Sequence, residues 1–156
     1  MRFPEVDTAI SALRSAVGVH HAYARSLLAQ YLAVLVSGHY EAKIRDLVQA
    51  RAQQTGDAEL ASFVEYAAGQ ILRNPDIDRI RRLLMQFGLG ARTAFDSARS
   101  QAANGEQSVT YFCNIVDARH VVAHGGSPQS YTFEDVCTFY EGSHCVLDWL
   151  ATALGV

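Results

Sequence analysis

Three polar residues near the end of one segment, Arg119, His120 and His124, have the types and the spacing that phosphate chemistry uses. They belong to the stretch DARHVVAHGGS, residues 117–127, which ends in two glycines and a serine. Histidine titrates near neutral pH, so it can give or take a proton during a reaction. Arginine keeps its charge and offers a fork of N–H donors that fits a phosphate. The stretch therefore predicts either a phosphate-handling site or only a helix that stops at the glycines.

Arg119 falls in the middle of the apolar face of the helix that this stretch predicts. At about 100° per residue, Phe112, Val116 and Ala123 form the centre of that face. An unpaired charge in an apolar environment is costly. We therefore expect Arg119 either to meet an anion or an acidic side chain, or to extend its charged end into water.

Asp117, His120 and His124 form a row on the neighbouring face of the same helix, at positions i, i+3 and i+7. His124 is the last residue before Gly125 and Gly126, so we expect it at the C-terminal end of the helix. A histidine followed by glycine is also a favourable helix end, because the helix dipole stabilises a cation there and glycine suits the C′ position. Taken alone, His124 is better explained as a helix end than as a catalytic residue, and the nearby arginine is what favours a site.

A second polar interruption occurs in a long helix earlier in the chain, at SGHYE, residues 37–41. Glu41 is a candidate partner that keeps Arg119 oriented, and Gly38 would let a neighbour approach closely. The alternative is an ordinary surface pair between Glu41 and Arg45 at i,i+4.

Helical spacing of apolar residues runs through nearly the whole chain, and no alternating pattern indicates a strand. The 156 residues suffice for one hydrophobic core and contain no repeat or linker. We therefore predict a single all-α domain over residues 1–156, a bundle in which a long second helix and a C-terminal helix pack around the helix of the opening stretch. Residues 89–106 are small and polar, and we expect a short helix and a loop there. The other expected helices are 5–17, 19–54, 57–73, 75–87, 107–124 and 133–154.

Two helix starts can be assigned to individual residues. Asn74 as N-cap and Pro75 at the first helical position begin the helix that Gly88 ends. Thr132 caps the last helix, with Asp135 in the place of the capping-box acid.

That last helix repeats apolar residues every seven positions, either as core or as a surface for a second subunit: Phe133, Tyr140, Leu147 and Leu154. Five aromatic residues are expected in the core: Tyr31, Phe112, Phe133, Tyr140 and Trp149.

The net charge of −3 excludes a protein that grips nucleic acid over a broad surface, because such binding rests on neutralising many phosphates. Any contact with nucleic acid must be local. The basic cluster of the chain consists of Arg79, Arg81 and Arg82 together with Arg73. It is either the solvated face of a helix or a weak RNA-binding track through Arg79 and Arg82.

The bulk sequence indicates a cytoplasmic protein. No stretch reaches the roughly 18–20 uninterrupted apolar residues of a membrane helix, and the start lacks the pattern of a secretory signal. The three cysteines show no CxxC spacing, which is typical of reduced thiols in the cytosol.

The stretch RHVVAHG resembles the R-x4-6-H motif of HEPN domains, which are small all-α domains often found in prokaryotic toxins and RNA-targeting defence proteins. Arg119 matches the arginine of the motif, His120 its polar position and His124 its histidine. The upstream segment NPDIDRIRRLLMQFG and the downstream segment TFEDVCTFYEGSHCVLDWL resemble the flanking helices of the RiboL-PSP-HEPN type. The likeness runs from about residue 20 to the C-terminus, and the first helix and residues 89–106 match nothing specific.

The resemblance implies an endoribonuclease that needs no metal or cofactor and works as a homodimer, with the motifs of two subunits in one cleft. His124 would be the general base or acid and Arg119 would hold the scissile phosphate, with His120, Asp117 and Glu41 in support. Products would carry a 2′,3′-cyclic phosphate and a 5′-OH, and DNA would resist cleavage because it lacks the 2′-OH. Such proteins are often toxins or defence components that an antitoxin or another regulatory protein restrains. His120 stands where the family often has asparagine, and it can still hydrogen-bond a phosphate.

Two readings from other classes remain open at this point. One is a HEPN-type module that binds RNA, nucleotides or a protein without cleaving anything. The other is a metal centre made by His39, His120 and His124, because His120 and His124 have the i,i+4 spacing that metal ligands use on a helix. In such metal centres the histidine pair normally lies inside a continuing helix, whereas two glycines directly follow His124 here.

Overall fold

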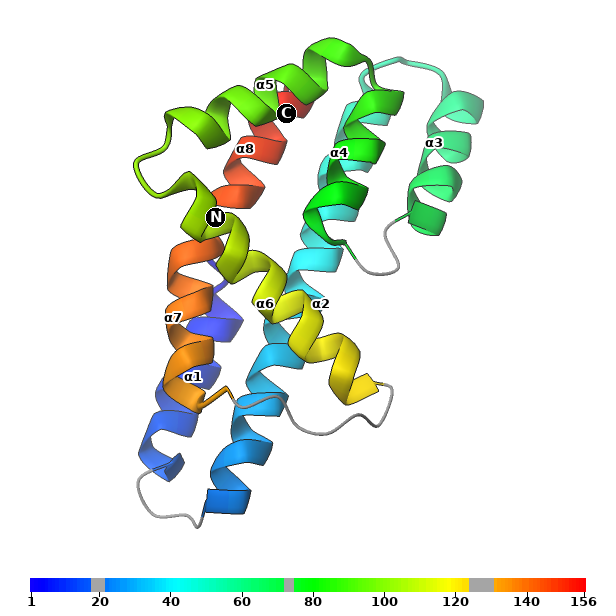
Figure 1. The fold of residues 1–156 in the computed structure, drawn as a ribbon. Coiled ribbons are helices and arrows are strands. Elements are labelled where there is room, and N and C mark those ends of the chain that lie inside the picture. The colour runs from blue at the N-terminus through cyan, green and yellow to red at the C-terminus, as the bar shows by residue number, and fades with distance from the viewer. Residues whose placement is uncertain (18–21, 72–74, 124–130) are drawn as a thin grey trace.

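The computed structural model describes residues 1–17, 22–71, 75–123 and 131–156, and these residues form an all-α bundle with no strand among them (Figure 1). The predicted fold class is confirmed. The helices are α1 (Pro4–Val17), α2 (Ala22–Gln53), α3 (Ala58–Ile71), α4 (Ile77–Gln86), α5 (Leu89–Gln101), α6 (Gly105–Ala123), α7 (Phe133–Ser143) and α8 (Cys145–Leu154).

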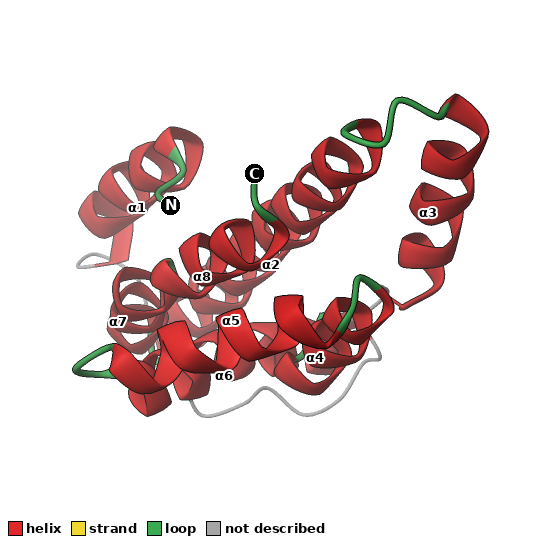
Figure 2. Ribbon diagram, turned by 90° about the horizontal axis from the view of Figure 1, so that it is seen from above, coloured by secondary structure: helices red, strands yellow, loops and turns green. Residues whose placement is uncertain are grey.

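The long helix α2 is the central element of the bundle. It contacts α1, α3, α6, α7 and α8, and it runs from one end of the molecule to the other while α3 stays at the edge (Figures 1 and 2). Its fully buried side repeats every four residues through Leu32, Val36, Tyr40 and Ile44. This spacing is that of one helix face, and burial of each such side chain contributes about 1.5–3 kcal/mol.

The crossing of α2 and α6 is fixed by a pair of stacked rings. The rings of Tyr40 on α2 and Phe112 on α6 lie 5.0 Å apart with an angle of 3° between their planes. The hydroxyl of Tyr40 also shares a hydrogen bond of 2.7 Å with Ser143 Oγ on α7. Burial raises the pKa of Tyr40, so this hydroxyl stays protonated. The three helices around the candidate site are thus held together by polar as well as apolar contacts.

The ring of Tyr111 on α6 lies directly against Gly142 of α7. A Cβ at Gly142 of α7 would overlap the ring of Tyr111 on α6. Any other residue at this position would have to displace the Tyr111 ring, so the packing favours glycine there.

The single C-terminal helix expected for residues 133–154 is wrong, because the structure divides it into α7 and α8 at His144. Ser143 Oγ bonds to the carbonyl of Phe139, four residues earlier. A serine that bonds back to this carbonyl often bends a helix. The heptad residues Phe133, Tyr140, Leu147 and Leu154 are nevertheless all buried within the chain. They are core, and the alternative of a surface for a second subunit is wrong for them.

Two other helices differ from the expectation at their ends. Helix α4 begins at Ile77, and Asp76 is its N-cap, with its Oδ1 accepting a hydrogen bond of 2.8 Å from Arg79 N. Aspartate caps as well as asparagine does, so the start assigned to Asn74 and Pro75 was placed too early; Asn74 itself lies outside the described residues. Residues 89–106 contain the expected helix and loop, but the helix is longer than expected: α5 covers 13 residues, and residues 102–104 connect it to α6. The fully buried Phe95 of α5 packs edge-on against Trp149 of α8, and this contact holds α5 against α8.

Other local predictions agree with the structure. Thr132 and Asp135 form the expected capping box. Gly88 follows α4 with a φ of 114°, a conformation that favours glycine. All three cysteines are free thiols. None of the helices in the described part of the chain has the length and apolar character of a membrane span.

Candidate functional site

Arg119 lies on the side of α6 that packs against α2. Its neighbours on that face, Phe112, Ile115 and Val116, are fully buried, whereas the Arg119 side chain keeps 31% of its surface exposed. Its Nη2 lies 3.4 Å from Oε1 of Glu41 on α2. An acidic side chain therefore meets the charge, and the exposed part leaves room for a further contact.

Glu41 lies between two arginines. Its carboxylate is only 13% exposed, and its Oε2 lies 4.0 Å from Nη2 of Arg45. Both sequence alternatives for Glu41 are thus present, and the contact with Arg119 between helices is the shorter one. Oε1 of Glu41 is buried and accepts no hydrogen bond. The donors of Arg119 are therefore held near the carboxylate without being used up by it.

The side of α2 that faces α6 carries a second buried polar atom. Ser37 is fully buried one turn before Glu41, and its Oγ has no hydrogen-bond partner. Between them, Gly38 does not serve the purpose that we expected, since a Cβ there would meet nothing within 4 Å. The space beside Gly38 is open with respect to the part of the chain that the structure describes.

His120 and Asp117 are exposed on the outer side of α6 and do not face α2. Cys113, one turn before Asp117, lies in hydrogen-bond contact with the backbone of Ile77 in the first turn of α4, and burial raises the pKa of its thiol. The face of α6 that carries His120 therefore lies on the α4 side of the bundle.

The described part of α6 ends at Ala123, so His124 lies outside the described residues, as do the glycines that follow it. The same is true of Arg73 in the basic cluster. The role expected for His124 stays a prediction.

The three-histidine metal centre is not compatible with the position of His39. Its ring packs on Phe3, with 5.1 Å between ring centroids. His39 and Glu41 are two positions apart and so point about 160° apart around the helix; because Glu41 faces α6, His39 faces away from it. Among the residues that the structure describes, no cluster of histidine, cysteine and carboxylate side chains could hold a metal ion.

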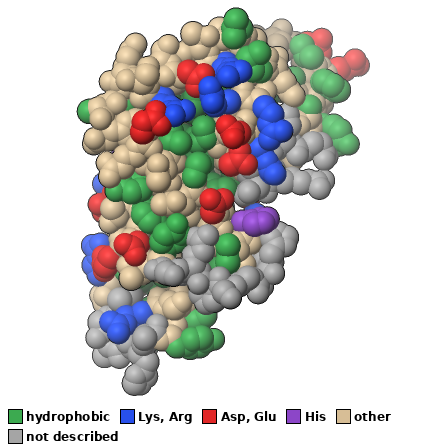
Figure 3. All heavy atoms as spheres, in the orientation of Figure 1, with side chains coloured by type: hydrophobic (Ala, Val, Ile, Leu, Met, Phe, Trp, Pro, Cys, Tyr) green, Lys and Arg blue, Asp and Glu red, His purple; other side chains and the backbone are tan. Residues whose placement is uncertain are grey.

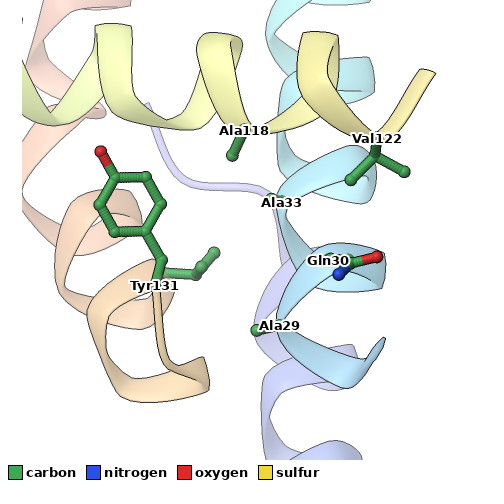
Figure 4. A pocket seen from close by; sticks show the side chains of 7 residues that line it. Ala29, Gln30, Ala33, Ala118, Val122 and Tyr131 are labelled. Carbon is green, nitrogen blue, oxygen red and sulfur yellow. The ribbon is translucent and has the colours of Figure 1, made fainter. Parts of the chain in front are cut away.

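A narrow apolar hollow lies between α2 and α6 (Figure 4). Ala118 and Val122 of α6 point toward Ala33, Gln30 and Ala29 of α2, while Tyr131 lies to the other side. Its volume of about 20 Å³ holds no more than a water molecule. The hollow therefore does not provide a binding site for a substrate.

An exposed apolar stripe runs along α2 toward the ion pair. It consists of large side chains on one face of the helix: Tyr23, Leu27, Tyr31 and Val34. Tyr31 is 55% exposed, so the prediction that places it in the core is wrong, whereas the other four aromatic residues are buried. The buried side of α2 is centred on Leu32, and Tyr31 points about 100° away from it.

The basic cluster separates into pairs and one unpaired side chain. Arg79 Nε lies 3.3 Å from Asp76 Oδ2, and Arg81 pairs with Asp96 of α5. Arg82 is exposed, and none of the carboxylates in the described ranges forms an ion pair with it. Asp96 was missed at the sequence level because residues 89–106 show no apolar periodicity; its i,i+4 spacing from Arg92 was the available signal.

An all-α bundle whose sixth helix turns an arginine toward a long second helix has the architecture expected of a HEPN domain. The sequence model of the RiboL-PSP-HEPN family matches residues 2–147. The chain belongs to this family. The match includes the first helix and residues 89–106, so the family extends over segments that resembled nothing specific. Comparison with curated proteins found no match, and comparison with solved structures found none either. HEPN domains are often ribonucleases, and they commonly bind RNA and form dimers.

Proposed function

We propose that this protein is a metal-independent endoribonuclease of the toxin or defence type, active as a homodimer in the cytoplasm and restrained by an antitoxin or other regulatory protein. The observation that carries the proposal is the state of Arg119. Its guanidinium occupies the apolar face of α6, is partly exposed and is paired with Glu41 without a hydrogen bond.

A half-buried arginine with free donors is suited to a phosphate. Each N–H of the fork can bond a non-bridging phosphate oxygen, and the bonds strengthen as negative charge builds in the transition state. Glu41 keeps the guanidinium in place before RNA arrives, so little side-chain freedom is lost on binding.

His124 supplies the proton transfers in this proposal. A general base removes the proton of the ribose 2′-OH, the 2′-oxygen forms a bond to phosphorus, and the bond from phosphorus to the 5′-oxygen breaks. The leaving 5′-oxygen takes a proton from a general acid. His124 of one subunit performs one of these transfers and His124 of the second subunit performs the other. His120 and Asp117 support the site from the neighbouring face of α6.

The exposed stripe on α2 supports a dimer. Monomeric proteins seldom expose a contiguous apolar surface of this kind unless it serves a contact. Val34, the last residue of the stripe, lies one turn before Gly38, where the open space admits the backbone of a second chain. Two copies that pack stripe against stripe about a twofold axis bring their Arg119 sites to one interface.

Expression of the wild type beside Arg119→Ala and His124→Ala tests the proposal. Arg45→Ala is a matched control, because it removes the other arginine that contacts Glu41. Growth arrest with RNA cleavage is expected for the wild type and the control, and for neither site variant. If all four proteins are folded, dimeric and equally harmless, and none cleaves varied RNA substrates, the protein is a binding module instead.

A further inference from the structure

A hollow between α4 and α5 is lined mainly by arginines. Its walls are Arg81, Arg82, Asp78 and Met85 of α4 together with Arg92 of α5, and its volume is about 260 Å³. Basic side chains gather on the face that carries α4 and α5, with acidic ones between them (Figure 3). The hollow is separate from the Arg119 site, which lies between α6 and α2.

Carboxylates offset only part of this positive charge. Asp96 is shared by two guanidinium groups, at 3.0 Å from Arg81 Nε and 3.6 Å from Arg92 Nε. Arg81 also donates a hydrogen bond of 3.1 Å to Asp96 Oδ2, so it is the better satisfied of the two. Arg82 forms no ion pair with any carboxylate in the described segments. With Asp78 counted as well, the hollow keeps a net positive charge in a chain whose overall charge is −3.

The arginines have distinct structural roles. The Arg81–Asp96 pair joins α4 to α5, and Arg81 Nε and Asp96 Oδ1 are both buried, so this pair forms a fixed wall. Arg92 Nε lies 3.6 Å from Asp96 Oδ2, the oxygen that also accepts the hydrogen bond from Arg81, and this contact leaves the other donors of Arg92 available. Among the described residues, no carboxylate pairs with Arg82, so its fork of donors is available. Two partly or wholly free guanidinium groups across a hollow are the arrangement that binds a phosphate.

The hollow is connected to the candidate site along α4. Arg79 lies one turn before Arg82, and the first turn of α4 contacts α6 through Ile77 and Cys113. Arg82 lies five positions after Ile77 along the helix, a rise of about 8 Å. The hollow and the face of α6 that carries His120 therefore lie at neighbouring positions along α4.

We infer that Arg82 and Arg92 bind a phosphodiester of the RNA backbone, at a position away from the bond that is cut. The inference rests on the proposed function, because it assigns two residues that contribute to binding of the same RNA substrate. The contact is with phosphate rather than with a base, so it does not depend on sequence. The walls in the described structure contain no histidine, and the hollow positions RNA without taking part in the chemistry.

Fluorescence anisotropy with a labelled single-stranded RNA tests the assignment. Its riboses carry 2′-O-methyl groups, so that attack by the 2′-oxygen cannot cut it during the titration. We expect Arg82→Ala and Arg92→Ala each to raise Kd about five- to tenfold, equally for different base sequences, and to lower the slope of log affinity against log salt by about 0.7–1. Arg82→Lys should recover part of the affinity because it keeps the charge.

Arg14→Ala is the control, because Arg14 is an exposed arginine that pairs with Glu134, away from the hollow. Circular dichroism verifies that each variant is folded. If Arg82→Ala and Arg92→Ala bind RNA as tightly as Arg14→Ala does, the assignment is wrong, while cleavage by the wild type would leave the proposed function intact. In a cleavage assay with ordinary RNA, the hollow variants should raise KM and leave kcat unchanged, whereas loss of kcat would contradict a role in binding alone. If the wild type neither binds nor cleaves any RNA, the proposed function fails together with this inference.

Discussion

Oε1 of Glu41 lies 3.4 Å from Nη2 of Arg119, and this ion pair joins the two helices that form the candidate site. Glu41 is the more deeply buried partner, and its carboxylate accepts no hydrogen bond at Oε1. The pair therefore orients the arginine electrostatically and leaves its donors available. On this account, the same contact contributes to stability and prepares the site for a phosphate.

The coupling between these two residues is measurable in a double-mutant cycle with Glu41→Gln and Arg119→Gln. We expect a coupling free energy of about 0.5–1.5 kcal/mol, because solvent screens the partly exposed guanidinium. Urea unfolding of the four proteins provides the free energies. The cycle of Glu41→Gln with Arg45→Gln is the control, and its coupling should be smaller because that arginine is farther away and more exposed. Equal couplings in the two cycles would show that Glu41 is a surface residue without preference for Arg119.

The exchange of charges offers an independent check of the same contact. In the Glu41→Arg, Arg119→Glu double variant, the two charges are still opposite, so stability should recover relative to the single variants. The melting temperature of the double variant is compared with those of the two single variants. Absence of any recovery counts against the contact.

Two glycines are expected to respond in opposite ways to alanine. Gly142→Ala places a Cβ on the ring of Tyr111 and should destabilise the protein by about 1–3 kcal/mol. Gly38→Ala meets nothing within 4 Å in the chain and should stabilise α2 by up to about 1 kcal/mol. Urea unfolding at low protein concentration compares the two variants with the wild type. Equal loss of stability in both would mean that the contact with the Tyr111 ring is not what favours glycine at position 142.

The apolar stripe on α2 is expected to mediate dimer formation. Tyr31→Glu places a charge at its centre and should convert the dimer to a folded monomer. Tyr66→Glu is the matched control, because Tyr66 on α3 is 69% exposed and lies on a different face. Sedimentation velocity of the two variants and the wild type gives the oligomeric state. A dimer that survives Tyr31→Glu but not Tyr66→Glu would move the interface to α3.

The Cys137 thiol should react slowly with alkylating reagents in the folded protein. Burial raises its pKa to about 11, so at pH 8 only about one thiol in a thousand is the reactive thiolate. The rate should rise as the pH approaches that pKa, and unfolding in urea should restore ordinary reactivity at pH 8. Mass spectrometry of the alkylated peptides follows Cys137 separately from the other cysteines. Fast labelling of Cys137 at pH 8 in the native protein would contradict its burial.

The sequence predicts best where local chemistry decides the structure. The Thr132–Asp135 capping box and the glycine after α4 depend on a few adjacent residues, and both agree with the structure. The position of Arg119 among apolar neighbours was also visible in the sequence, because a helix of known period determines which residues share a face.

The prediction fails where tertiary packing decides. Tyr31 is a large aromatic residue of a type often found in cores. It is exposed because another side of α2 meets the other helices. The division of the C-terminal helix at His144 depends on Ser143, whose hydroxyl contacts Tyr40, 103 residues away in the sequence. Arg92 and Asp96 lie in a segment without apolar periodicity, so the hollow that they border with α4 could not be found before the fold was known.

Cleavage of a defined RNA by the purified protein, in the presence of a chelator, tests the central claim most directly. We expect products with a 2′,3′-cyclic phosphate and a 5′-OH, and no cleavage when a 2′-deoxyribose precedes the scissile phosphate. The rate for Arg119→Ala should be at least about a hundredfold lower. Intact RNA with the wild-type dimer would contradict this claim, and so would cleavage by Arg119→Ala at the wild-type rate.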